Sequence, residues 1–310
     1  MTGKWDCRNI PSLQGKTVLV TGGTSGIGFE IVSVLAQAGA DVVFTGRSPD
    51  TGEQAIGKIK DQNDRAQVVF EQNDISDLEQ VRRISDIIKQ RYDDLDILIN
   101  CAGITRLNPR RLSADGYEMQ FATNYLGHFA LSAQLFPLMR RSQSARIISV
   151  SSIAHKAGTL QFDDLQGEKH YSPTEAYRQS KLAQLIFALE YQKRLQMSGL
   201  SMKSIPAHPG LSLTNIYQTV FSRQPFLLKL VLNVVRIVGQ SAAAGALPVL
   251  YAATSPEAEG GIYYGPQGFM DLKGPPGKAH IAPQAQNQSD AVRLWEISEK
   301  LTGLRFEGLS

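Results

Sequence analysis

The chain alternates short runs of aliphatic and β-branched residues with longer segments of helical periodicity, and this alternation constrains its fold more than any other feature. The runs predict strands, and the segments between them predict helices. Strands are expected at 16–21, 41–45, 67–70, 96–99, 146–150, 201–207 and 261–264, and helices near 26–38, 52–60, 77–91, 113–138, 174–197 and 240–253. Because the strand runs are almost continuously apolar, they indicate a parallel sheet covered on both faces. The pattern therefore predicts an α/β fold with one doubly wound sheet of seven strands and helices on both faces.

The same alternation predicts one domain over residues 1–310, with 266–310 as a C-terminal extension. No internal repeat or linker divides the sequence, and its 42% of hydrophobic residues is typical of a globular protein. Right-handed crossovers place the carboxyl ends of parallel strands along one edge, where ligands of such sheets bind. Functional residues are therefore expected where strands end.

Composition excludes several classes of function. A net charge of +3 is too small for the basic face of a nucleic-acid-binding protein. Cys7 and Cys101 lack the spacing of a zinc site, and no two of the five histidines have helical metal-pair spacing, so no metal is expected. The N-terminal residues lack a secretory signal core, and the most apolar stretch, 226–238, is shorter than the roughly 20 residues of a spanning helix. We therefore expect a cytoplasmic protein.

A glycine-rich turn joins the first expected strand to the first expected helix. The turn reads Thr-Gly-Gly-Thr-Ser-Gly-Ile-Gly over residues 21–28. Glycines allow the backbone to turn tightly and approach a pyrophosphate, which the N–H groups and dipole at the start of the helix favour. The residues expected to bind a dinucleotide here are Gly22, Thr24, Ser25, Gly26, Ile27 and Gly28.

The spacing of these glycines resembles the short-chain dehydrogenase/reductase superfamily, which implies a Rossmann fold and a nicotinamide cofactor. An acidic residue after the second strand would indicate NAD. This chain has Arg47 there, and its guanidinium is suited to the 2′-phosphate of NADP(H). Two alternatives remain open: Arg47 is a solvated loop residue, or Asp50 reaches back to the ribose.

The resemblance implies further cofactor contacts at later strand ends. Asp74 matches the family residue that contacts the adenine, and Ile75 follows it. Cys101 stands where the family usually has a second asparagine, while the small residues that follow it are kept. The remaining expected cofactor contacts are Asn100, Ala102, Gly103, Tyr177, Lys181, Pro209, Gly210 and Thr214.

Tyr177 and Lys181 lie four positions apart, on one face of a predicted helix. A tyrosine has a pKa near 10, and lowering it to near 7 requires about 4 kcal/mol, which a nearby ammonium and a nicotinamide cation can supply together. The resemblance makes Tyr177 the acid/base, Ser152 the serine that binds the substrate oxygen, and Asn124 the fourth member of a catalytic tetrad. Ser151 is the alternative serine, and a core polar role is the alternative for Asn124.

Tyr177 follows Ser152 by 25 positions, which is wider than in most of the superfamily. The inserted run includes 162–167, and a Ser-Ser-x-Ala-His pattern occupies 151–155. Both features resemble the retinol-dehydrogenase-like branch, which includes the WW-domain-containing oxidoreductase. We expect this chain to have neither a WW module nor the membrane anchor of many members of that branch.

The segment 226–238 has one polar stripe, formed by Lys229, Asn233 and Arg236, and a broad apolar face. It lies within 211–240, where the family places its substrate lid. Three uses are open: a lid over an apolar substrate, a face that contacts a membrane or a partner, and ordinary core.

The leading hypothesis is an NADP(H)-dependent oxidoreductase that acts on an apolar aldehyde, ketone or alcohol, retinoid-like or steroid-like by analogy with the branch. The alternative is a catalytically silent protein that senses NADP(H) or serves as a scaffold. By analogy with the superfamily, we also expect a homodimer that pairs through the helices near 113–138 and 174–197.

Overall fold

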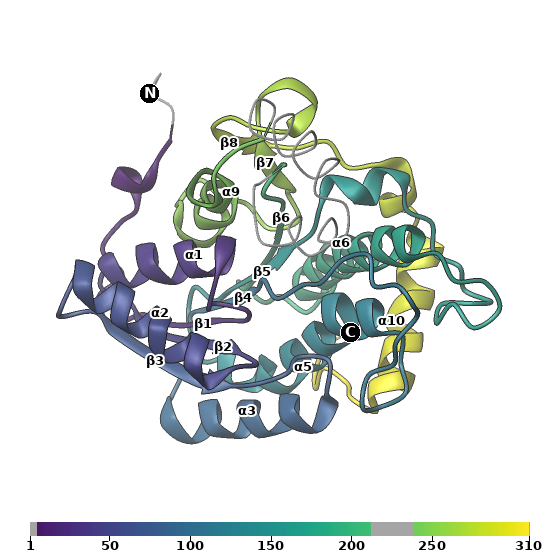
Figure 1. Cartoon of the computed structure of the whole chain (residues 1–310), viewed down its shortest axis with the longest axis horizontal. Helices are drawn as coiled ribbons and strands as arrows, with labels where there is room; N and C mark the ends of the chain where they lie inside the picture. Colours follow the sequence, from purple (N-terminus) through teal and green to yellow (C-terminus); the bar gives the residue numbers. More distant parts are fainter. Residues whose placement is uncertain (1–4, 212–238, 310) are drawn as a thin grey trace.

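The computed structural model describes residues 5–211 and 239–309, and its centre is an eight-stranded sheet (Figure 1). The strand order is β3-β2-β1-β4-β5-β6-β7-β8, and every neighbouring pair is parallel except β7 and β8. The strands are β1 (Thr17–Val20), β2 (Asp41–Gly46), β3 (Gln67–Gln72), β4 (Ile97–Asn100), β5 (Arg146–Val150), β6 (Lys203–Ala207), β7 (Tyr264–Pro266) and β8 (Pro276–Lys278).

The expected doubly wound α/β fold is confirmed, but the expected count of seven strands is wrong. The additional strand β8 has three residues and runs antiparallel to β7. Glycine and proline surround it in the sequence, so it lacks the apolar run that predicted the other strands. The last expected strand, 261–264, overlaps β7 only at Tyr264.

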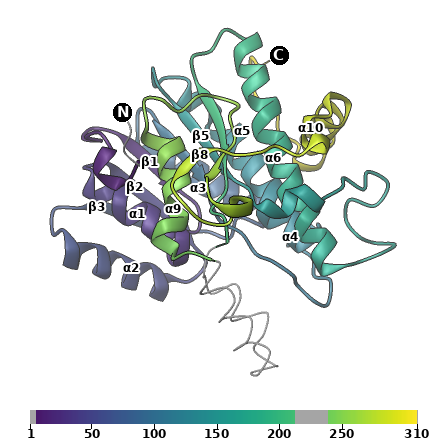
Figure 2. The ribbon, with the colours of Figure 1, turned by 90° about the horizontal axis from the view of Figure 1, so that it is seen from above.

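Helices cover both faces of the sheet. The core places α1, α2 and α9 on one face and α3, α5 and α6 on the other, and Figure 2 shows α10 outside α6. The longer helices are α1 (Gly26–Gln37), α2 (Pro49–Gln62), α3 (Leu78–Arg91), α5 (Gly127–Met139), α6 (Pro173–Met197), α9 (Ala242–Thr254) and α10 (Gln288–Thr302). The short helical turns are η1 (Cys7–Asn9), α4 (Met119–Phe121), η2 (Ala122–Leu126), η3 (Ile153–Ala157), η4 (Phe269–Asp271) and η5 (Pro283–Gln286).

Successive residues of the central strands are buried on opposite faces of the sheet. Val18 and Val20 belong to the core beneath α1 and α9, whereas Leu19 belongs to the core shared with α5 and α6. All three side chains have no exposed surface. Both faces are therefore apolar, which explains the near-continuous hydrophobic runs in the sequence.

The helix expected over 113–138 begins later and is not uniform. Residues before Met119 form a turn in which Leu112 bridges Glu118, and the Glu118 carboxylate accepts a hydrogen bond from the N–H of Phe121. The next five residues form the π-helix η2, and the α-helix α5 continues from Gly127. Asn124 therefore lies in a π-helical turn.

Three expectations concern residues outside the described ranges. Thr214, most of the expected lid at 211–240 and the apolar segment 226–238 lie there. Across residues 5–211 and 239–309, no helix is long and apolar enough to cross a membrane.

Candidate active site

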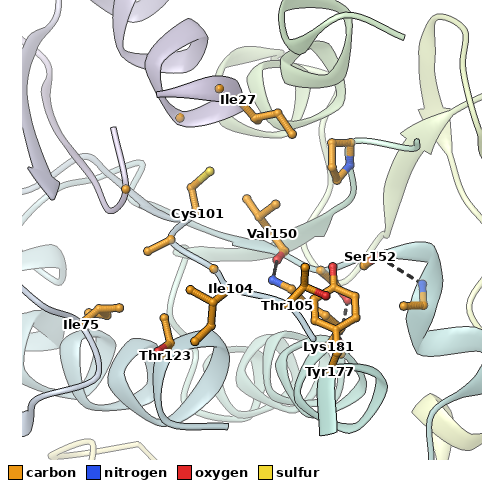
Figure 3. Close-up of a pocket in the computed structure, with 18 of the residues that line it drawn as sticks. Ile27, Ile75, Cys101, Ile104, Thr105, Thr123, Val150, Ser152, Tyr177 and Lys181 are labelled. Carbon is orange, nitrogen blue, oxygen red and sulfur yellow. Dashed lines mark hydrogen bonds between the residues drawn. The ribbon is translucent and has the colours of Figure 1, made fainter. Parts of the chain in front are cut away.

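A cavity of about 660 Å³ lies at the carboxyl ends of the parallel strands. Residues that follow β1, β2, β3, β4, β5 and β6 line it, together with the first turns of α6. Figure 3 shows Ser152, Tyr177 and Lys181 gathered at one end, and Ile75 at the other. The cavity thus joins the segments that were expected to bind cofactor and those expected to perform chemistry.

The glycine turn has the close backbone packing that its sequence predicts. Gly22 and Gly26 have φ values of 72° and 56°, in the left-handed region that favours glycine. A Cβ on Gly28 would lie 2.1 Å from the Gly22 oxygen. The N-cap residue of α1, Ser25, makes no side-chain cap hydrogen bond, so the first N–H groups of this helix face the turn without that partner.

Thr21 connects the glycine turn to the end of β4. Its hydroxyl oxygen accepts hydrogen bonds from the backbone N–H groups of Cys101 and Ala102, at 2.9 and 3.0 Å. A Cβ on Gly22 would lie 2.8 Å from the Cα of Ala102, so the two segments are in direct contact. This role of Thr21 was not expected from the sequence.

Arg47 and Asp74 lie after β2 and β3, at the end of the cavity opposite Ser152, Tyr177 and Lys181. Arg47 is exposed and lines the cavity, and its carbonyl accepts a hydrogen bond from Gln72. Asp50, the alternative to Arg47, lies in the first turn of α2 and is not among the residues that line the cavity. Asp74 also lines it, and its carboxylate accepts hydrogen bonds from the N–H and the hydroxyl of Ser76.

Lys181 lies behind Tyr177 on α6, and both residues line the cavity (Figure 3). The Lys181 side chain is 5% exposed, and its ammonium donates to the Val150 carbonyl at 2.9 Å and to Oε1 of Gln184 at 3.1 Å. Burial lowers the pKa of Lys181 to about 8. Two acceptors therefore fix the position of the ammonium. Its burial makes the ammonium more acidic than that of an exposed lysine.

The two adjacent serines after β5 have different hydrogen-bond partners. Ser151 is buried, and its hydroxyl donates to the backbone carbonyl of Lys181 at 2.7 Å. Ser152 is partly exposed in the cavity, and its hydroxyl oxygen accepts a hydrogen bond from the N–H of Ala154 at 3.2 Å. The Ser152 hydroxyl proton therefore remains able to reach a ligand.

Asn124 is fully buried behind the cavity wall. Its amide accepts from the Ile104 N–H at 2.8 Å and donates to the Ile104 carbonyl and to the Ser180 hydroxyl. It is close to the other expected catalytic residues, because a Cβ on Gly103 would lie 3.2 Å from Oδ1 of Asn124 and 3.4 Å from Nζ of Lys181. Asn124 therefore fixes the wall segment in front of Lys181.

Asn100 and the Pro-Gly turn differ in their relation to the cavity. Asn100 does not line it, because its side chain is buried and donates to the hydroxyl of Ser132 on α5. Pro209 and Gly210 do line it. Gly210 has a φ of 64°, and a Cβ there would lie 2.3 Å from the Leu272 oxygen.

A buried polar chain behind the cavity was missed by sequence reasoning. The side-chain amide nitrogen of Gln184 is hydrogen-bonded to Nδ1 of His128 at 3.2 Å, and Nε2 of His128 is hydrogen-bonded to the Thr21 hydroxyl at 2.9 Å. Burial lowers the pKa of His128 to about 3, so this ring is neutral at ordinary pH. The sequence spacing could have indicated these residues, because His128 follows Asn124 by four positions and Gln184 follows Lys181 by three. Residues three or four positions apart lie on the same face of a helix. This series of hydrogen bonds connects α6, which carries Tyr177 and Lys181, to the end of β1.

Comparison with known proteins identifies the family. A family model described as short chain dehydrogenase matches residues 16–225, which include the glycine turn, both serines, Tyr177 and Lys181. The chain belongs to the short-chain dehydrogenase family. This family uses a nicotinamide cofactor for hydride transfer at CH–OH groups, so the protein is an oxidoreductase of that general type.

Relatives place this short-chain dehydrogenase in the retinol-dehydrogenase-like branch, as expected. It is 36% identical to retinol dehydrogenase 12 of Bos taurus over 301 residues, covering 97% of this chain and 90% of the relative. It is 34% identical to human retinol dehydrogenase 14 over 308 residues, covering 94% and 88%. A solved structure of an uncharacterised protein from Mycobacterium paratuberculosis has a TM-score of 0.80 and 33% identity, covering 98% and 99% of the two chains.

The residues of this short-chain dehydrogenase fit a nicotinamide dinucleotide. The places where Gly22 and Gly28 pack leave no room for a side chain, so the backbone itself forms that part of the cavity floor. Thr24, Ser25, Gly26 and Ile27 also line the cavity at the start of α1. The cofactor of the family therefore has a cradle of backbone N–H groups at one end and a tyrosine-lysine pair at the other.

Proposed function

We propose that the protein is an NADP(H)-dependent oxidoreductase that transfers hydride to or from the carbonyl or hydroxyl carbon of an apolar aldehyde, ketone or alcohol. The observation that carries this proposal is that Ser152, Tyr177 and Lys181 line one cavity together with the glycine turn. Arg47 at the opposite end supports the preference for NADP(H) over NAD(H). The names of the retinol dehydrogenase relatives support an apolar, retinoid-like substrate.

A bound nicotinamide would supply or accept the hydride, and the side chains of this protein would manage the proton. In the reductive direction, the Tyr177 hydroxyl donates its proton to the carbonyl oxygen, and the Ser152 hydroxyl donates a hydrogen bond to the same oxygen. The two serines are thereby distinguished, since the hydroxyl of Ser151 is committed to the backbone of Lys181.

Lys181 would favour the phenolate form of Tyr177 by its positive charge. An ammonium has three N–H donors, and two of those on Lys181 are taken by Val150 and Gln184. One donor remains for the phenolic oxygen or a ribose hydroxyl. Asn124 would act on the same region by holding the backbone of Ile104.

The proposal is tested by following NADPH oxidation with a panel of apolar aldehydes and ketones. Tyr177→Phe removes the proton donor, so we expect kcat to fall by about 10²-fold or more while the affinity for NADPH is retained. Tyr92→Phe is the matched control, because Tyr92 ends α3 away from the cavity and its hydroxyl contacts Asp41. This variant should keep full activity.

Two outcomes would contradict the proposal. The first is a Tyr177→Phe variant that retains the rate of the unmodified protein. The second is an absence of turnover across the whole panel combined with tight NADPH binding by calorimetry, which would favour the alternative of a cofactor-sensing or scaffold protein.

A further inference from the structure

An arginine at the cavity wall has an unfavourable backbone conformation. Arg106 lines the cavity directly after Ile104 and Thr105, which Figure 3 shows beside Lys181 and Tyr177. Its φ is 52°, in the left-handed region that residues with a Cβ seldom occupy. Strained residues of this kind cluster at ligand sites, where surrounding contacts hold them.

Buried hydrogen bonds hold Arg106 in this conformation. Its backbone N–H donates to Oε1 of Gln120 at 2.6 Å, and Gln120 has no exposed surface. The amide nitrogen of Gln120 donates in turn to the Tyr171 hydroxyl and to the Pro173 carbonyl, each at 3.2 Å. Pro173 is the first residue of α6, so Arg106 is fixed relative to the helix that carries Tyr177.

The backbone alone does not account for an arginine here. Glycine adopts a positive φ without steric penalty, and asparagine or aspartate does so more readily than arginine. The side chain is exposed at the cavity wall instead of packing in the core. The exposed side chain of Arg106 therefore presents a guanidinium at this wall, where it can meet a ligand.

The charges around this end of the cavity are unbalanced. Among the described residues that line the cavity, the only carboxylate is Asp74, which follows β3. Arg178, the other arginine near Tyr177, is paired with Glu175, whereas the guanidinium of Arg106 has no polar partner within 5–211 and 239–309. The segment 212–238 contains no Asp or Glu in its sequence. Arg106 thus presents a positive charge that no carboxylate of the described chain neutralises.

We propose that Arg106 is a specificity-determining residue that binds a carboxylate or phosphate on the substrate. A guanidinium binds either oxyanion through two parallel N–H donors. The inference rests on the proposed function and makes its substrate class narrower. The preferred substrate is an apolar aldehyde or alcohol that ends in an anionic group.

The test compares straight-chain aldehydes, from hexanal to dodecanal, with counterparts of equal length that carry a terminal carboxylate or a terminal phosphate. We expect kcat/KM with NADPH to be about tenfold or more higher for an anionic member than for its neutral counterpart. This ratio should fall as salt concentration rises, because the site is open to solvent. Whether the carboxylate or the phosphate series has the higher ratio identifies the anion.

Arg106→Gln should reduce the ratio to about one. Arg111→Gln is the matched control, because Arg111 is an exposed arginine close in sequence that does not line the cavity. This control should keep the ratio of the unmodified protein. Arg106→Gly should also reduce the ratio of kcat/KM values to about one. It should not lower the unfolding midpoint, since glycine relieves the backbone strain.

Several results would overturn the inference. The first is an equal kcat/KM for neutral and anionic aldehydes in the unmodified protein. The second is an anionic-to-neutral ratio of kcat/KM that stays unchanged in Arg106→Gln. A loss of NADPH affinity in Arg106→Gln, with the ratio intact, would assign the arginine to the cofactor and overturn the inference too. Turnover without an anion preference contradicts only this inference, whereas no turnover of any aldehyde with NADPH bound contradicts the proposed function itself.

Discussion

Among single residues, Arg47 is the one that we expect to favour the phosphorylated cofactor, because it lines the cavity after β2. Its charge-assisted contacts with a 2′-phosphate should contribute on the order of 1.5 to 3 kcal/mol, or about 10- to 150-fold in affinity. We therefore expect Arg47→Ala to weaken NADPH binding by this factor and to leave NADH binding nearly unchanged. Calorimetric titration of both cofactors measures the effect.

Arg65→Ala is the control for general loss of positive charge, because Arg65 is an exposed arginine that does not line the cavity. It should bind both cofactors as the unmodified protein does. Equal affinity of the unmodified protein for NADPH and NADH would show that the end of β2 does not select the cofactor. A preference that survives Arg47→Ala would show the same.

Residues at strand ends could be predicted because topology alone brings them together. Ser152 and the glycine turn line one cavity as expected, although more than a hundred positions separate them. His128 and Gln184 could not be assigned in this way, because their contacts depend on how α5 and α6 pack against each other. Asn100 remains a predicted cofactor contact, and its side-chain amide donates a hydrogen bond to the hydroxyl of Ser132.

Among the helices and strands, sequence reasoning found those that carry a strong hydrophobic period. It missed α10, although Asn287 is an N-cap whose side chain accepts from the N–H groups of Ser289 and Asp290. This helix lies in the segment 266–310, which was expected only as a C-terminal extension with no helix assigned to it. The apolar residues of α10, among them Trp295, follow the helical period and pack on α6. The π-helix η2 has no such signature, because it depends on local packing.

The start of α5 is a contact point between this helix and the segment after β3. A Cβ on Gly127 would lie 1.8 Å from the Ile75 oxygen, so Gly127→Ala requires the two segments to separate. We expect the free energy of unfolding to fall by about 1–3 kcal/mol, as for other overpacked sites. Urea unfolding monitored by circular dichroism measures the change.

Gly57→Ala is the matched control, since Gly57 lies inside α2 and a Cβ there would meet nothing within 4 Å. The same substitution at this position should stabilise the protein by about 0.4–1 kcal/mol, because alanine restricts the unfolded chain and favours helix. Equal effects at both glycines would contradict the contact with Ile75.

Across the whole molecule, three of the five histidines are buried in the folded state. His128, His155 and His208 have 1% or less of their surface exposed. Burial lowers the pKa of His128 and of His208 to about 3, and it also lowers the pKa of His155. An unfolded chain has ordinary histidines with a pKa near 6.5. The folded and unfolded states therefore bind different numbers of protons below neutral pH.

The sign of this difference makes acid destabilising. Between pH 6.5 and about 3, the unfolded state holds protons on His128 and His208 that the folded state lacks, so the free energy of unfolding falls as pH falls. The lowered pKa of His155 acts in the same direction. Each ring contributes about 1.4 kcal/mol per pH unit once its unfolded form is protonated.

Urea unfolding at intervals from pH 7 to pH 5, above most carboxylate titration, should show this slope. His128→Gln should reduce the slope by about one ring's contribution. A slope in this variant equal to that of the unmodified protein would show that His128 takes up a proton in the folded protein, contrary to its burial among Thr21, Asn124 and Gln184.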